Sequence, residues 1–119
     1  MTGGAKGIGA AIVRLLAGEG AVPVIVDRDA EAGAQLQNEV RSQGAACGLV
    51  TVELANPEDC SRAVEQAVKA FGRLDALVNN AGRNDKSRPG AGKSARICGL
   101  AQNATWCITT AWRITPCRI

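Results

Sequence analysis

The 119-residue sequence contains no tyrosine and no histidine, and only one phenylalanine and two tryptophans. A mechanism in which a phenol or an imidazole serves as acid or base is therefore excluded for this chain alone. With so few aromatic rings and a net charge of only +3, the sequence has no basic stripe interleaved with stacking rings, and we expect no nucleic-acid partner. No apolar run approaches the ~20 residues of a membrane-spanning helix, so no membrane partner is expected.

The five cysteines show no C-x-x-C spacing, and no histidine accompanies them, so no metal site is expected. They are Cys47, Cys60, Cys98, Cys107 and Cys117. Their odd number, together with the lack of a secretory signal pattern, favours reduced thiols and a cytoplasmic location. The length predicts at most one domain.

A glycine-rich stretch opens the chain. Residues 2–9 read T-G-G-A-K-G-I-G, and an apolar helical pattern follows directly. Glycine allows the backbone to turn sharply and to come close to a ligand, because it has no Cβ. A helix that begins at such a loop directs free N–H groups and the positive end of its dipole toward the ligand, which favours a pyrophosphate. Glycine-rich turns are common, however, so the pattern needs its structural context.

Helical and strand-like segments alternate along the chain. Apolar spacing and cap residues predict helices over 7–19, 30–43 and 56–71, and short β-branched or apolar runs predict strands over 22–26, 47–52 and 74–78. Such alternation is typical of a parallel sheet with right-handed crossovers, in which ligands bind at the carboxyl ends of the strands. In the first helix, we expect the apolar residues that recur at helical spacing to form one buried stripe: Ile8, Ala11, Ile12, Leu15 and Leu16.

Asp27 closes the first of these expected strands, eighteen residues after Gly9. In a βαβ dinucleotide unit, an acid about 20 residues beyond the glycine loop binds the adenosine ribose hydroxyls. The alternative is a helix N-cap or a solvated loop acid, the role expected of Asp29. A carboxylate at this place repels a 2′-phosphate, which favours NAD over NADP. Lys6 and Arg28 argue weakly the other way, because either could reach a phosphate, but we interpret both as surface charges.

Two motifs carry a family resemblance. The pattern T-G-x-x-x-G-I-G at residues 2–9 and the pattern N-N-A-G at residues 79–82, with Asp27 between them, make residues 1–85 similar to the short-chain dehydrogenase/reductase family. The resemblance implies an α/β fold of the Rossmann type, a doubly wound parallel sheet that binds NAD. Within the family, residues 3–82 look most like members that oxidise L-fucose or hydroxysteroids.

The resemblance also implies cofactor-binding roles. In the family, the residues matching Gly3, Gly7, Ile8 and Gly9 line the pyrophosphate, and the residue matching Asp27 holds the adenosine ribose. Glu53 and Leu54 stand where the family usually has Asp-Val beside the adenine. The residues matching Asn80, Ala81 and Gly82 pack near the ribose and stabilise the central sheet. With the two nearby cations, the candidate cofactor site is Gly3, Lys6, Gly7, Ile8, Gly9, Asp27, Arg28, Glu53, Leu54, Asn80, Ala81 and Gly82.

The sequence also departs from the family pattern. The family's first strand precedes the T-G motif, where this chain has only Met1, as a start read from an internal valine codon would produce. We therefore expect a truncated sheet, a glycine loop without its anchor, and flanking strands without their shared partner. The family's catalytic Ser, Y-x-x-x-K and Asn lie downstream of N-N-A-G, and this chain has no tyrosine for that role. It therefore contains no catalytic residue that the resemblance can identify.

Residues 86–119 differ in character from the rest. They hold six Lys or Arg, no Asp or Glu, and no persistent helical or strand period, so we expect an irregular basic tail. Reading the adjacent codon frame can restore a family-like continuation, and our hypothesis is that these residues are a frameshifted translation of a longer dehydrogenase gene. DNA sequencing of the region tests it, because the other frame must continue into a Y-x-x-x-K segment.

The sequence thus predicts the NAD-binding half of an NAD-dependent oxidoreductase that acts on an alcohol or sugar hydroxyl. We expect no turnover by the chain alone, since a small-molecule substrate would bind only in the full-length parent. Two alternatives stay open. One is a non-catalytic nucleotide-binding or interaction module that associates with a full-length homologue, and the other is a gene remnant without a stable fold.

Overall fold

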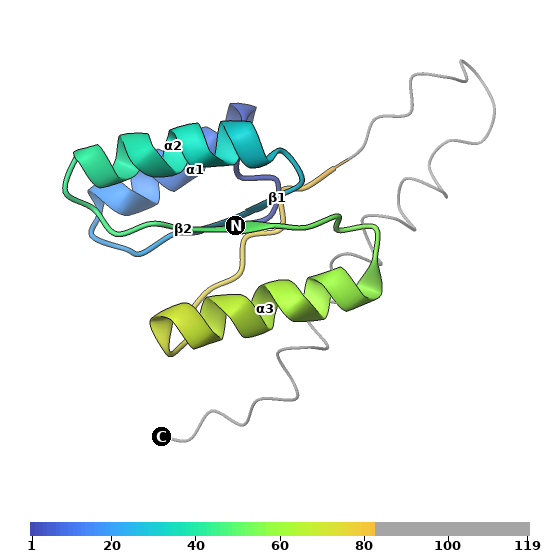
Figure 1. The fold of residues 1–119 in the computed structure, drawn as a ribbon. Coiled ribbons are helices and arrows are strands. Elements are labelled where there is room, and N and C mark those ends of the chain that lie inside the picture. The colour runs from blue at the N-terminus through green and yellow to red at the C-terminus, as the bar shows by residue number, and fades with distance from the viewer. Residues whose placement is uncertain (83–119) are drawn as a thin grey trace, which may run out of the picture.

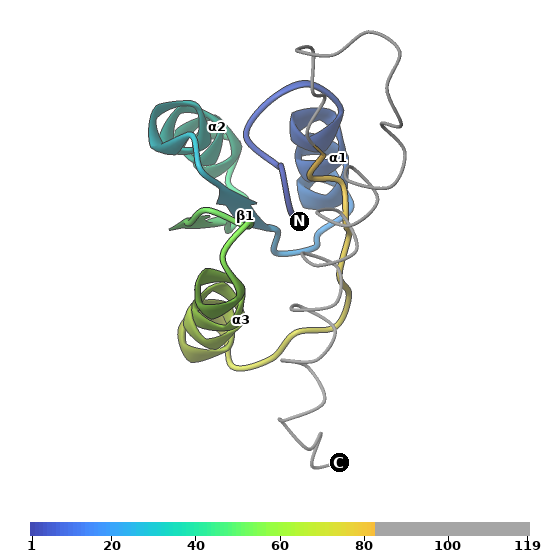
Figure 2. The same cartoon turned by 90° about the vertical axis from the view of Figure 1, so that its right-hand side faces the viewer.

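A computed structural model describes residues 1–82, and the predicted basic tail over 86–119 lies outside these residues. The elements alternate in the expected order. They are α1 (Gly7–Gly18), β1 (Val24–Asp27), α2 (Ala30–Ser42), β2 (Gly48–Thr51) and α3 (Pro57–Phe71). Figures 1 and 2 show α1 and α2 on one face of the sheet and α3 on the other. The predicted α/β, doubly wound architecture is therefore confirmed.

The sheet is parallel and short. Strands β1 and β2 pair over four residues each, from Val24 opposite Gly48 to Asp27 opposite Thr51. The third expected strand, over 74–78, is not formed as a strand. Directly after that segment, Asn79 forms one isolated bridge with Thr2, and Thr2 also bridges Val26. A ladder needs several consecutive partners, and the first two residues of the chain supply only one.

Thr2 connects the two halves of the described sheet. Its N–H donates to the Val78 carbonyl oxygen at 3.0 Å, and the Gly3 N–H donates to the Val26 carbonyl oxygen at 2.8 Å. The Val26 N–H in turn donates to the carbonyl oxygen of Met1 at 2.9 Å. The expectation that the glycine loop lacks an anchor and that its flanking segments lack a shared partner is therefore wrong. Three consecutive residues suffice, because Met1 and Gly3 form hydrogen bonds with β1 along one edge while Thr2 bonds Val78 along the other.

The inner face of α1 consists of small residues. Gly9, Ala10, Val13 and Ala17 are its buried members. The predicted stripe is wrong in part, since Ile8 is 75% exposed and Leu15 is 67% exposed, Ala11 is exposed as well, and Ile12 and Leu16 are only partly buried. At the first turn of α1 the reason is the close approach of the glycine loop, since a Cβ on Gly9 would lie 2.1 Å from the Gly3 carbonyl oxygen.

The other two helices each bury an apolar face against the sheet. Leu36 and Val40 of α2 join the α1 face of the core, where Ile25 of β1 is fully buried. On the opposite face, Val26 and Val50 pack with Ala63 of α3. Neighbouring residues of β1 thus point into opposite layers, as the period of a strand requires.

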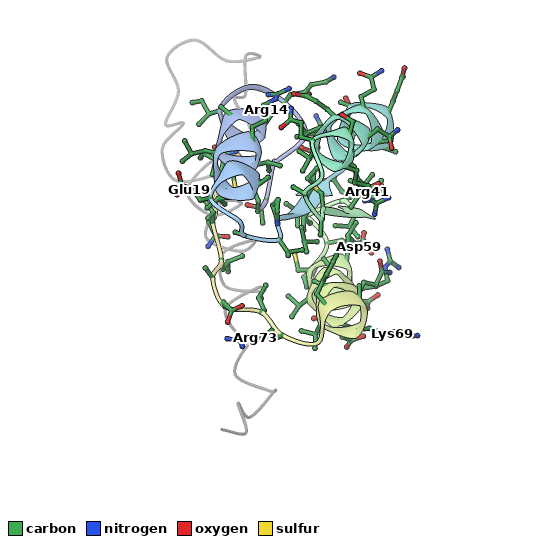
Figure 3. The ribbon with its side chains drawn as sticks, turned by 90° about the vertical axis from the view of Figure 1, so that its left-hand side faces the viewer. Arg14, Glu19, Arg41, Asp59, Lys69 and Arg73 are labelled. Carbon is green, nitrogen blue, oxygen red and sulfur yellow. The ribbon has the colours of Figure 1, made fainter. Side chains whose placement is uncertain are left out.

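Charged side chains lie on the outside of the helices (Figure 3). Arg14 of α1 binds Glu39 of α2 through two hydrogen bonds, from Nε to Oε1 at 2.7 Å and from Nη2 to Oε2 at 2.8 Å. This bidentate pair links the two helices that share one face of the sheet. Within residues 1–82, no helix is both long and apolar enough to cross a membrane.

Candidate functional site

The glycine loop folds back onto the first turn of α1. Gly3 and Gly7 have positive φ values of 61° and 55°, which side-chain-bearing residues rarely adopt. A Cβ on Gly9 would lie 2.1 Å from the carbonyl oxygen of Gly3, so the two segments touch through their backbones. A Cβ on Gly7 would meet nothing within 4 Å. Gly3 and Gly9 therefore shape the loop, and Gly7 alone of the three faces open space.

A buried threonine locks the loop to the N-N-A-G segment. The Thr2 side chain is almost fully buried at 3% exposure, and its Oγ1 accepts hydrogen bonds from the N–H groups of Asn80 at 3.0 Å and Ala81 at 3.1 Å. In the other direction, Nδ2 of the Asn80 side chain donates a hydrogen bond to the Gly3 carbonyl oxygen at 3.0 Å. A Cβ on Gly3 would lie 2.9 Å from Ala81 Cα. The two motifs, almost eighty residues apart, thus form one structural unit.

Thr2 was not among the predicted site residues. Its signal in the sequence was its place as the first letter of the T-G motif, but a hydroxyl beside glycines is too common to predict a partner at position 80.

Gly82 ends the described residues, beside Asn80 and Ala81. Leu54 is partly buried and packs against Cys60 and Val64 of α3.

The carboxylate of Asp27 joins the loop to the strand end. Its Oδ2 accepts a hydrogen bond from the Ala5 N–H at 3.0 Å, and its Oδ1 accepts one from the Asp29 N–H at 3.1 Å. Asp27 is half-buried at the carboxyl end of β1, beside the start of α1. The helix-capping alternative applies to Asp29 and not to Asp27, because Asp29 is the N-cap of α2 and its Oδ1 accepts from the Ala32 N–H at 3.0 Å.

Both cations of the predicted site are paired with acids. Lys6 Nζ lies 2.5 Å from Asp29 Oδ2, and Arg28 Nη1 lies 3.7 Å from Glu53 Oε2. The hydrogen bond from Lys6, followed by that from the Ala32 N–H, lowers the pKa of Asp29. The same contact with Asp29 raises the pKa of Lys6. Lys6 and Arg28 are exposed, as a surface interpretation expects, but neither charge is left unbalanced.

The N-terminus of α1 differs from those of the other two helices. It has no side-chain cap and no acidic residue in its first turn, whereas α2 has Asp29 and Glu31, and α3 has Glu58 and Asp59. A helix N-terminus carries a partial positive charge and unpaired N–H groups. The start of α1, with Gly7 open beside it, can therefore receive an anion. Among the described residues, no group of three histidine, cysteine or acidic side chains is placed to hold a metal ion.

Comparison with known proteins points in one direction. The family model for short chain dehydrogenases matches residues 1–99. The A-factor type gamma-butyrolactone 1′-reductase (1S-forming) of Streptomyces virginiae is 45% identical over 94 residues, which are 79% of this chain and 34% of that protein. L-fucose dehydrogenase of Oryctolagus cuniculus is 39% identical over 89 residues, 75% of this chain and 30% of that protein. The chain thus spans about a third of the length of these relatives.

Solved structures agree in fold. A metagenomic short-chain oxidoreductase in complex with NADP superposes with a TM-score of 0.81 at 30% identity, covering 92% of this chain and 52% of that one. The 3-ketoacyl-(acyl-carrier-protein) reductase from Brucella melitensis, complexed with NADH, has a TM-score of 0.79 at 32% identity, covering 92% of this chain and 45% of that one.

Proposed function

The chain belongs to the short chain dehydrogenase family, as the resemblance of residues 1–85 predicted, and from that premise we propose that it is the dinucleotide-binding part of an NAD-dependent oxidoreductase. One observation carries the proposal. The carboxylate of Asp27 is held at the carboxyl end of β1 by the N–H groups of Ala5 and Asp29, next to the uncapped N-terminus of α1. A carboxylate and a helix N-terminus so placed match a ribose and a pyrophosphate.

The described residues fit such a cofactor. Gly7 leaves the approach to α1 open, and the first-turn N–H groups of that helix would bind the pyrophosphate. Ile8, which is largely exposed, would cover the bound molecule, and Asn80 would hold the loop in shape through its bond to the Gly3 carbonyl. When bound, a nicotinamide cofactor supplies hydride transfer.

Asp27 supports NAD over NADP, because its charge would repel a 2′-phosphate. Relatives of similar fold have been solved with either NADP or NADH, so family membership alone does not decide between them. For the full-length protein we propose an alcohol or a sugar hydroxyl as substrate. For the 119 residues alone we propose no turnover, because they contain neither the tyrosine nor any histidine that could move the proton.

Titration with NAD tests the proposal. A ligand that binds only the folded state stabilises it, by about 2.7 kcal/mol at a hundredfold excess over Kd. We expect saturable heat of binding and a rise in Tm with NAD. Asp27→Asn should weaken both, since it removes the charge and keeps only one of the two oxygens that accept from the N–H groups of Ala5 and Asp29.

Asp75→Asn is the matched control. Asp75 is an exposed acid paired with Arg73, in the segment that enters the sheet from the opposite edge. The Asp75→Asn variant should bind NAD with the same affinity as the unaltered chain. A chain that unfolds cooperatively but shows neither heat nor a shift in Tm with NAD or NADP would refute the proposed function.

A further inference from the structure

The edge of the candidate site carries an unusual balance of charge. Two cations, Lys6 and Arg28, stand beside three carboxylates, those of Asp27, Asp29 and Glu53. Each cation is in contact with one acid, whereas the third carboxylate, on Asp27, accepts hydrogen bonds from the backbone N–H groups of Ala5 and Asp29. The cluster therefore has one net negative charge, although a count of nearby cations alone would suggest an anion site.

This balance bears on the choice between the two nicotinamide cofactors. NADP differs from NAD by a phosphate on the adenosine ribose, and a flexible lysine or arginine beside the ribose is the usual way to hold such a group. Lys6 follows Ala5, whose N–H binds Asp27, and Arg28 follows Asp27 directly. Each cation is thus next in sequence to a residue that forms or holds the Asp27 carboxylate, and each would have to leave an acid to bind a 2′-phosphate there.

We infer that Asp29, and to a smaller extent Glu53, are specificity-determining residues that exclude NADP by engaging the two cations able to bind its 2′-phosphate. The inference rests on the proposed function, namely that a dinucleotide binds with its ribose at Asp27. Neither acid has to touch the cofactor, because each acts by withholding a cation from it.

Asp29 has the stronger effect for three reasons. Its contact with Lys6 is 2.5 Å, against 3.7 Å for Glu53 and Arg28. Its side chain is held in place, since it also caps α2 through the Ala32 N–H. It is less exposed than Glu53, so solvent screens its charge less. Lys6 would therefore gain little interaction energy if it left the Asp29 carboxylate to bind the 2′-phosphate of NADP.

Two isosteric variants separate the charge from the hydrogen bond. In Asp29→Asn, the amide oxygen can still accept from the Ala32 N–H, and in Glu53→Gln it can still accept from the Ala55 N–H that Glu53 Oε1 binds at 3.3 Å. The Kd values of NAD and NADP are measured by calorimetry on the full chain and both variants, at low and at high salt. Circular dichroism melts confirm that each variant folds.

We expect Asp29→Asn to lower the Kd of NADP about fivefold, because one unit charge at close range in a solvated site has an effect of this size. The Kd of NAD should stay within about twofold of its value in the unaltered chain. Glu53→Gln should tighten NADP binding by about twofold. Both gains should shrink as salt screens the freed cation. Adding Lys6→Gln to Asp29→Asn should remove the gain, whereas Lys6→Gln alone should leave NADP binding nearly unchanged.

Failure of the inference and failure of the proposed function give different results. If NAD binds but the ratio of the two Kd values is the same in the unaltered chain and both variants, the inference is overturned and the proposed function stands. If Lys6→Gln alone weakens NADP binding strongly, Lys6 was already free, and the inference is again overturned. If neither cofactor binds any folded form, the proposed function fails and the inference fails with it.

Discussion

Gly9→Ala is the substitution for which the structure makes the sharpest prediction. In an ordinary helix, alanine in place of glycine stabilises by about 1 kcal/mol, because it reduces the freedom of the unfolded chain and favours helical angles. At Gly9, however, the new Cβ would lie 2.1 Å from the Gly3 carbonyl oxygen and 2.9 Å from Asn80 Nδ2. Both are shorter than any real contact of a Cβ, and the first is with backbone that cannot rotate away.

Three contributions decide the magnitude. Moving packed backbone to admit one methyl group costs about 1–3 kcal/mol, and this contact lies at the severe end. Displacing the Gly3 carbonyl also weakens its 3.0 Å hydrogen bond from Asn80, which is worth about 1 kcal/mol. Set against the gain in helix propensity, the net loss is about 2–3 kcal/mol, a large share of the roughly 5–15 kcal/mol typical of a folded domain.

Gly18→Ala is the matched control, because the same substitution is made at the other end of the same helix. Gly18 is exposed, its φ is negative, and a Cβ there would meet nothing within 4 Å. It should stabilise by up to about 1 kcal/mol. Urea unfolding followed by far-UV circular dichroism, without ligand, measures both changes. In thermal melts followed by the same signal, Tm should fall on the order of 10 °C for Gly9→Ala and rise by a few degrees for Gly18→Ala.

If Gly9→Ala were as stable as Gly18→Ala, the close approach of the loop to α1 would not exist in solution. The hydrogen bond from Asn80 to the Gly3 carbonyl oxygen and the tight packing around Gly9 would then be absent too, because both depend on that approach.

Three further predictions concern single side chains. Thr2→Val keeps the shape but removes the hydroxyl that Asn80 N–H binds, and it should cost about 1–3 kcal/mol in urea unfolding, whereas Thr2→Ser should lose much less. Because Lys6 lowers the pKa of Asp29, the stability this carboxylate contributes is present above its ordinary value of 3.8 and is lost as pH falls through the lower folded value. The stabilities of Asp29→Asn and the unaltered chain should therefore converge below about pH 4, and a constant difference down to pH 2 would contradict this. Burial raises the pKa of the Cys47 thiol, so at pH 8 iodoacetamide should modify it far more slowly in the folded chain than in urea, as peptide mass spectrometry would show; equal rates would mean that the thiol is accessible.

The helix boundaries were predictable because local chemistry marks them. Asn56-Pro57 begins α3, and Gly72, with a φ of 81°, ends it, as a left-handed residue does at many helix ends. The buried face of α1 was not predictable in the same way. Periodicity allowed a stripe of large residues such as Leu15 or one of small residues such as Val13, and hydrophobicity favoured the wrong one. The choice depended on how closely the helix approaches the sheet, which is a property of contacts distant in sequence.

The sequence alone was sufficient to predict the order of the elements, the family, and the edge of the sheet where the two motifs and Asp27 meet, because each of these follows from spacing along the chain. It did not determine the partners of individual side chains. Only the folded chain brings Thr2 against Asn80 and sets Lys6 on Asp29, because these pairs combine segments that are far apart in sequence. Such contacts depend on distances of a few ångströms between separate elements, and packing of the whole core decides those distances.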